Sequence, residues 1–257
     1  MILRRFTANL RRQDWTAVAV ELVIVVLGVF IGLQAQEWAT ARAEQQRADV
    51  LLQQLRRDLD IEKFTLKMMM DYQQVTLDYA KAAIKGLESP GSVDPETWVV
   101  SAYQASQILP TQSIRATFDE MKSTGAIDLI RNVKFRTMLI NYYGYDWSQG
   151  STIKGQAPYR ELVRSALPYV VQKAINASCG DINETIDVVV VTRLPKTCHI
   201  DLTDADISSA AATLRATPGF LPALTYQLSL IETNIASLPI AQQQLADVIA
   251  MAAKAAP

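Results

Sequence analysis

The sequence predicts a mainly all-α protein, in which one amino-terminal transmembrane helix continues into a long helix packed in an extramembrane helical bundle. Three observations predict this fold. An apolar run fills residues 16–33, no proline occurs from residue 15 to residue 87, and apolar residues recur at helical spacing through most of the remaining chain. A small β-rich insertion near residues 179–198 is the expected exception to helix.

The apolar run has the length and flanks of a membrane span. At about 1.5 Å per residue, the segment 15–38 covers most of a hydrocarbon core about 30 Å thick. Trp15 and Trp38 stand where interfacial aromatic residues are common. A cleaved signal peptide is the alternative, because basic residues precede the run and the small residues of 39–43 resemble a cleavage site. The polar residues that follow the run favour a retained anchor.

Charges beside the span predict its orientation. More arginines precede the run than closely follow it, and the positive-inside rule therefore favours a cytoplasmic amino terminus. We expect residues 1–14 in the cytoplasm, 15–38 in a bacterial inner membrane and 39–257 in the periplasm. The arginines before the run are Arg4, Arg5, Arg11 and Arg12.

The segment after the span continues the helix. Residues 52–87 carry an apolar stripe at three-four spacing, interrupted by Glu62 and Gln73, which calls for a packing partner from later helices. Ser89–Ser92 breaks the helix, and Asp94 with Pro95 marks the start of the next one. Further helices are expected at residues 95–109, from 113, at 132–143, at 159–177 with a bend at Pro168, at 204–214 and at 221–253 with an interruption at Pro239; a strand or hairpin is expected around 186–191.

Composition excludes several classes of function. The 25 basic and 26 acidic residues nearly cancel, which gives no electrostatic reason to expect nucleic acid as a partner. His199 is the single histidine, and the chain contains neither a nucleophile elbow nor a phosphate-binding loop. Acid pairs such as Asp119 with Glu120 are more typical of solvated helix faces than of proton transfer. We therefore predict no enzyme activity, no cofactor and no metal.

The span itself offers a contact face. Gly28 and Gly32 form a small-x-x-x-small pair that permits close approach of another helix, and Glu21 lies near the same face. A charge at that depth calls for a partner or for protonation. We interpret the face as a contact with other transmembrane subunits or with a second copy of the chain. The alternative is that Glu21 reaches the headgroups and that both glycines are merely tolerated.

Cys179 and Cys198 bracket the β-rich segment. An oxidising compartment permits them to pair, and a disulfide is the leading interpretation. Free thiols, or a metal held by both thiolates with His199 and either Asp181 or Asp201, are the alternatives.

Aromatic residues cluster in the middle of the chain. Tyr143, Tyr145 and Trp147 are candidates for a partner or ligand surface. Packing in the core is the alternative, and burial of these side chains would favour it. Three consecutive methionines, Met68–Met70, likewise suit either packing or a partner surface.

Two segments together resemble a bacterial family of membrane proteins. Residues 21–28, ELVIVVLG, are followed by the IGLQ of 31–34, and residues 118–125, FDEMKSTG, lead through LIRN to the double tyrosine at 142–143. These segments resemble the DUF6090-type proteins, although Thr124 stands where that pattern has a small serine. The resemblance spans about a third of the chain. It implies a single anchor with a helical extramembrane domain, and it supplies no catalytic residue.

These observations favour a non-catalytic accessory or scaffolding subunit of a membrane complex, in contact with the bilayer and with other membrane subunits. A periplasmic ligand-binding sensor is the alternative, although residues 1–14 are too short for an output domain and signalling would need a separate partner. A membrane-anchored enzyme is a weaker alternative.

Overall fold

The computed structural model describes residues 15–145, 147, 158–186 and 189–254. The predicted cytoplasmic segment 1–14 and most of the loop expected at 144–158 lie outside these residues. The described chain is mainly helical with a two-stranded sheet, so the predicted fold class is confirmed.

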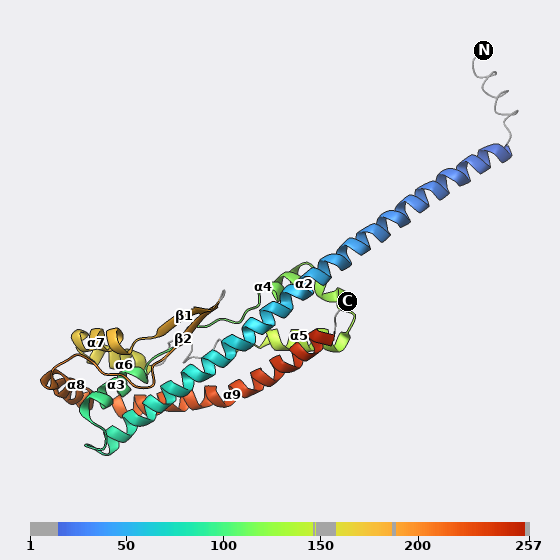
Figure 1. Ribbon diagram of the computed structural model, residues 1–257. Helices are drawn as coiled ribbons and strands as arrows, with labels where there is room; N and C mark the ends of the chain where they lie inside the picture. Colours follow the sequence, from blue (N-terminus) through green and yellow to red (C-terminus); the bar gives the residue numbers. More distant parts are fainter. Residues whose placement is uncertain (1–14, 146, 148–157, 187–188, 255–257) are drawn as a thin grey trace, which may run out of the picture.

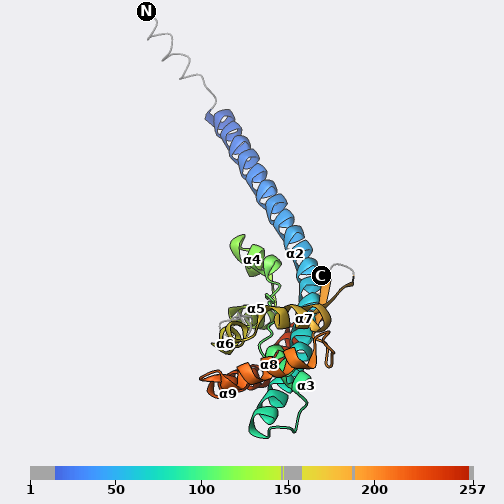
Figure 2. The ribbon, with the colours of Figure 1, turned by 90° about the vertical axis from the view of Figure 1, so that its left-hand side faces the viewer.

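One helix, α2 (Trp15–Glu88), runs the whole length of the molecule. Its amino-terminal part projects far from the rest of the chain, and two perpendicular views show nothing packed beside it (Figures 1 and 2). The sequence contains no proline in this stretch, and alanine, leucine, glutamine and arginine favour helix after the apolar run. The predicted continuation of the span into one long helix is confirmed.

The domain is built around the second half of α2 and the antiparallel helix α9 (Phe220–Lys254). The predicted apolar stripe of α2 faces this partner, and Leu55, Leu59 and Leu66 are completely buried. At the end of α9, the carbonyl oxygen of Ala252 accepts a hydrogen bond from Arg56 Nε at 3.1 Å. Residues nearly 200 positions apart therefore close the bundle beside the point where α2 leaves the domain.

The helix α3 (Pro95–Gln104) packs against the far end of α2. Asp94 caps it through the Thr97 amide, as the sequence predicts. Trp98 lies so close to Gly86 that a Cβ atom there would stand 2.2 Å from Trp98 Cδ1. The helix ends five residues before the predicted end at Leu109, because the Ser106 hydroxyl binds the Tyr103 carbonyl oxygen and Pro110 disfavours helix just before it.

Three short elements follow beside the middle of α2: α4 (Ala116–Ser123), the 3₁₀ helix η1 (Ala126–Leu129) and α5 (Val133–Gly144). Gly125 separates the first two with φ of 75°, a left-handed conformation that favours glycine. Asn132 caps α5 through the Phe135 amide, as predicted. The prediction of a helix from Ser113 was wrong by three residues, because Ser113 and Ile114 bind a side chain of α2 instead.

The predicted bent helix at 159–177 is two helices, α6 (Pro158–Ala166) and α7 (Tyr169–Cys179). Pro168 separates them because it has no amide hydrogen and its ring conflicts with the preceding turn. After α7 the chain forms a hairpin of β1 (Ile182–Ile186) and β2 (Val189–Arg193), which is the predicted β-rich insertion. The helix α8 (Asp204–Ala216), capped by Thr203, then leads to α9.

Candidate functional site

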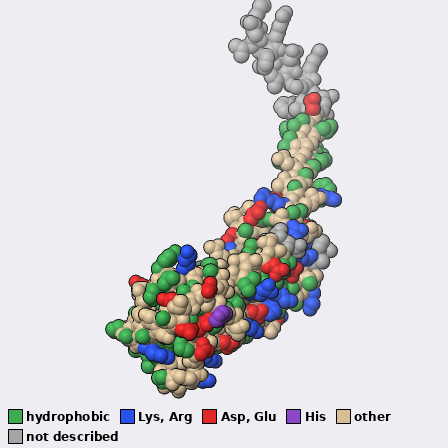
Figure 3. Space-filling view, turned by 60° about the vertical axis from the view of Figure 1, so that its left-hand side comes forward, with side chains coloured by type: hydrophobic (Ala, Val, Ile, Leu, Met, Phe, Trp, Pro, Cys, Tyr) green, Lys and Arg blue, Asp and Glu red, His purple; other side chains and the backbone are tan. Residues whose placement is uncertain are grey.

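The structure leaves the predicted contact face of the span open. The large apolar side chains from Val20 to Leu33 are 52% to 64% exposed, and a Cβ atom added at Gly28 or Gly32 would meet nothing within 4 Å. Hydrophobic side chains accordingly lie along the visible face of the projecting part of α2 (Figure 3). Among the described residues, α2 is the single helix long and apolar enough to cross a membrane. Contact of Glu21, Gly28 and Gly32 with a partner stays a prediction.

The open face continues along the domain. In an ideal helix about 18 residues make five turns, so Gly28 aligns with Gln46 and Phe64, and Gly32 aligns with Val50. Gln46, Val50 and Phe64 are all exposed. The two glycines therefore lie on the side of α2 that its own domain leaves uncovered, and a second helix can approach them without meeting that domain.

A buried polar arrangement surrounds Glu62, which is 0% exposed. Its Oε1 accepts hydrogen bonds from Ser113 Oγ at 2.7 Å, Tyr142 OH at 2.9 Å and Trp147 Nε1 at 2.9 Å. Its Oε2 accepts one from the Ile114 amide at 2.6 Å. A single carboxylate on α2 thus binds three segments that lie 51 to 85 residues away in the chain.

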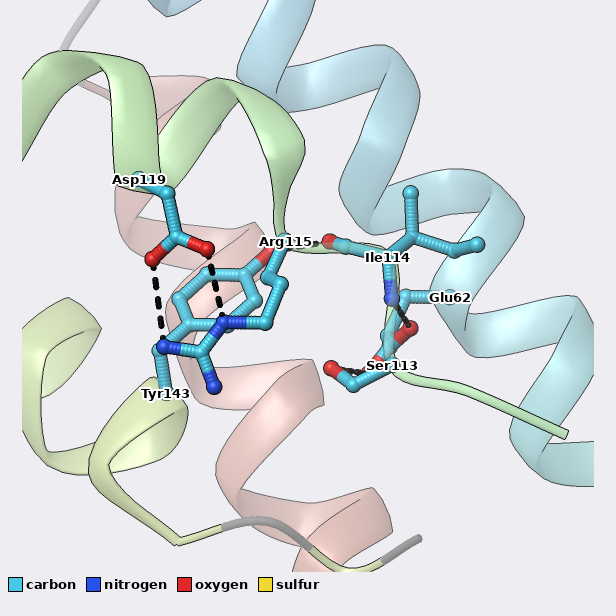
Figure 4. Close-up of polar contacts among 6 residues, drawn as sticks. All are labelled: Glu62, Ser113, Ile114, Arg115, Asp119 and Tyr143. Carbon is cyan, nitrogen blue, oxygen red and sulfur yellow. Dashed lines mark hydrogen bonds and ion pairs between the residues drawn. The ribbon is translucent and has the colours of Figure 1, made fainter.

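Figure 4 shows which neighbouring side chains point to this carboxylate and which point elsewhere. Glu62 points to Ser113 and Ile114, whereas Arg115 turns to Asp119 and forms two hydrogen bonds with it at 2.9 and 3.1 Å. Tyr143 donates its hydroxyl to the Ile114 carbonyl oxygen at 3.0 Å. Ser113 and Ile114 are therefore held between Glu62 of α2 and Tyr143 of α5, and we call this arrangement around Glu62 the polar clasp.

The aromatic residues predicted as a surface mostly belong to this clasp. Tyr143 and Trp147 are buried, at 3% and 6% exposed, and Tyr143 stacks on Phe118 with ring centroids 4.4 Å apart. For these two the surface prediction was wrong, because their polar atoms bind the Ile114 carbonyl and Glu62 inside the domain. Tyr145 is 61% exposed, so its role in a partner surface stays a prediction.

Burial and nearby acids hold the clasp tyrosines in their neutral form. Desolvation raises the pKa of Tyr142 well above its ordinary value, and the charge of Glu62 and the hydrogen bond to it raise it further. Desolvation also raises the pKa of Tyr143, with added contributions from the charges of Glu62 and Asp58. Both hydroxyls therefore remain hydrogen-bond donors at physiological pH, which is what their acceptors require.

The role of Glu62 was not predicted from the sequence. The available signal was its position, because an acid interrupted an otherwise apolar stripe at helical spacing. A charged residue on the buried face of a helix needs compensating donors. That rule predicts a polar partner for Glu62, but the identity of the partners depends on which distant segments pack there.

The predicted disulfide is present. Cys179 and Cys198 are bonded, with their Cα atoms 5.4 Å apart, and the bond closes the segment that contains the hairpin. His199 contacts Glu96 and not the cysteines: its Nδ1 lies 2.7 Å from Glu96 Oε1, and its side chain is 86% exposed. Within the described ranges no group of three or more metal-ligating residues is found. The metal alternative at these cysteines is excluded, since disulfide sulfurs are not thiolates.

Two grooves lie along the exposed side of α2. The first, of about 490 Å³, runs between α2 and β2 and has Phe64, Met68 and Val191 among its lining residues. The second, of about 680 Å³, lies between α2 and α9 where Pro239 interrupts the regular hydrogen bonding of α9. Phe64 and Lys67 line both, so the grooves are neighbours on one face.

No family model, curated protein or solved structure matches the chain. The similarity to the DUF6090-type proteins therefore stays a prediction. The fold and the long apolar helix together are compatible with a single-pass membrane protein.

Proposed function

We propose that the chain is a single-pass inner-membrane protein with a periplasmic helical domain that acts as a non-catalytic accessory or scaffolding subunit of a membrane complex. The observation that carries the proposal is the continuity of α2 from the exposed apolar segment into the core of the domain. A partner at Gly28 and a partner at the domain would be held at a fixed separation by one unbroken helix.

The topology rests on charge and on the disulfide. The arginines before the span favour a cytoplasmic amino terminus, and the bond between Cys179 and Cys198 suits an oxidising compartment. Labelling of cysteines in intact and permeabilised cells tests this topology. Two thiols that react without reductant would contradict it, because a reducing compartment would leave both cysteines free.

Association through the span is tested by paired substitutions. Gly28→Ile with Gly32→Ile should release a stable partner from the detergent-solubilised protein, because β-branched side chains prevent close helix approach. Val26→Leu with Phe30→Leu is the matched control, since both residues lie on the opposite side of an ideal helix. A homogeneous free monomer from the parent chain, or equal association in both variants, would reject the proposed docking face.

A ligand-binding sensor is the second candidate, and the groove between α2 and β2 favours it. Its volume of about 490 Å³ falls in the range of small-molecule sites, and α2 forms one wall. A ligand there would contact the same helix that enters the membrane. Thermal stabilisation of the solubilised chain by a bound small molecule, lost in Met68→Arg and retained in the exposed control Lys81→Ala, would favour the sensor over the scaffold.

A further inference from the structure

The outer edge of β1 is unpaired in the part of the chain that the structure describes. β1 pairs with β2 on one side, in a two-stranded sheet, and all five of its residues are exposed. The Thr192 amide donates to Met68 Sδ at 3.2 Å, so it points away from β1. Its partner in the register, Asn183, therefore belongs to a pair without mutual backbone bonds. Asn183 and Thr185 then direct their amides and carbonyls to the open edge.

The apolar face of the hairpin is also incomplete on that side. Side chains alternate along a strand, so Ile182, Glu184 and Ile186 share a face with their cross-strand neighbour Val191. Val191 packs against α2 and is 8% exposed. Ile182 and Ile186 are each 49% exposed, and it is β2 that packs against α2. The hairpin is supported by a helix through β2, which contacts α2, whereas the two isoleucines of β1 stay half exposed.

We propose that β1 binds an extended segment of another protein as a third strand. The outward backbone groups of Asn183 and Thr185 would pair with that segment, as in other complexes formed by strand addition. β-branched apolar residues of the partner would cover the outer sides of Ile182 and Ile186. Glu184 lies between the two isoleucines on the same face and binds Arg193 of β2 through Oε2 at 3.0 Å. A lysine or arginine of the partner would share this carboxylate with Arg193 from the open side of β1.

Antiparallel pairing with the β1 strand of a second copy does not satisfy the edge. The strands of the hairpin run roughly along α2 (Figure 1), so antiparallel pairing of two β1 strands would point the two α2 helices in opposite directions. Two chains anchored by the same end in one bilayer cannot adopt that arrangement. This exclusion rests on the proposed membrane anchorage, whereas the open edge itself does not.

The test uses the full chain in detergent micelles and a defined probe, the fluorescent peptide acetyl-Thr-Val-Thr-Lys-Thr-Val-Thr-amide. Fluorescence anisotropy should show saturable binding, and hydrogen exchange at the Asn183 and Thr185 amides should slow in the complex. The same peptide with N-methylated threonine amides should bind at least about tenfold more weakly, because it loses edge donors.

Two variants separate edge pairing from side-chain contact. Thr185→Pro removes an outward amide and should weaken binding at least about tenfold, whereas Thr185→Ala keeps the amide and should bind like the parent. Circular dichroism and an intact disulfide establish that each variant is folded. Absence of saturable binding, equal binding of the N-methylated peptide, or slow exchange at both amides in the free chain would overturn the proposal. None of these outcomes depends on membrane insertion, so the proposed anchorage is judged separately.

Discussion

The clasp around Glu62 gives the sharpest test of the packing of the domain. In Glu62→Gln the oxygen that faces Ser113, Tyr142 and Trp147 loses its charge, and each of those three hydrogen bonds weakens by about 1 kcal/mol. The new amide nitrogen faces the Ile114 amide, and this buried donor then costs about 1–3 kcal/mol. Relief from burying a charge offsets part of this loss. We expect a net destabilisation of about 2–3 kcal/mol.

The measurement is urea unfolding of the solubilised full chain, followed by near-ultraviolet circular dichroism. Asp60→Asn is the matched control, because this exposed acid lies on the same helix and its neutralisation should change the free energy of unfolding by less than about 0.5 kcal/mol. A double-mutant cycle with Tyr142→Phe should give a coupling of about 1–2 kcal/mol with Glu62. If Glu62→Gln leaves the free energy of unfolding within about 0.5 kcal/mol of the parent, the charged clasp is refuted.

Three further outcomes are expected from the structure. Reduction of the disulfide should lower the free energy of unfolding by about 3 kcal/mol, because it frees a loop closed across a sequence separation of 19; unchanged denaturation in reductant would contradict this. Gly86→Ala should cost about 2 kcal/mol or more by the same unfolding assay, since its Cβ would overlap Trp98, whereas Ala82→Gly is a control for helix propensity alone. The free energy of unfolding should fall as the pH rises above about 10, by up to about 1.4 kcal/mol per pH unit for each buried tyrosine. The reason is that tyrosines of the unfolded chain ionise there, whereas burial raises their pKa in the folded chain. A free energy of unfolding that stays constant from about pH 9 to about pH 11 would contradict this expectation. The tyrosines concerned are Tyr72, Tyr142, Tyr143 and Tyr159.

Local signals predicted most of the elements. The absence of proline before Pro90, the stripe at helical spacing and the caps at Asp94 and Asn132 act within a few residues, so they can be identified without knowledge of the fold. The hairpin and its disulfide were likewise predicted correctly, from β-branched residues between two cysteines. Predicted helix boundaries were wrong where a hydrogen bond to a distant residue replaced the helical one, as at Ser113.

The candidate site depended on contacts that sequence spacing does not encode. Tyr143 and Trp147 have the composition of a recognition surface, and only tertiary contacts, among them the packing of α5 against α9, decided that they are buried. The open edge of β1 is similar, because strand propensity predicts the hairpin but not which edge is covered.

The sequence by itself determined the long apolar amino-terminal helix, the helical class and the cysteine pair, since these follow from side-chain type and from spacing along a single helix or strand. The tertiary structure alone decided that Glu62 binds three distant segments, that the glycine face of the apolar segment lies on the uncovered side of α2, and that the outer edge of β1 carries no further strand among the described residues. The physical reason is that burial and hydrogen-bond satisfaction are properties of surfaces brought together from far apart in the chain.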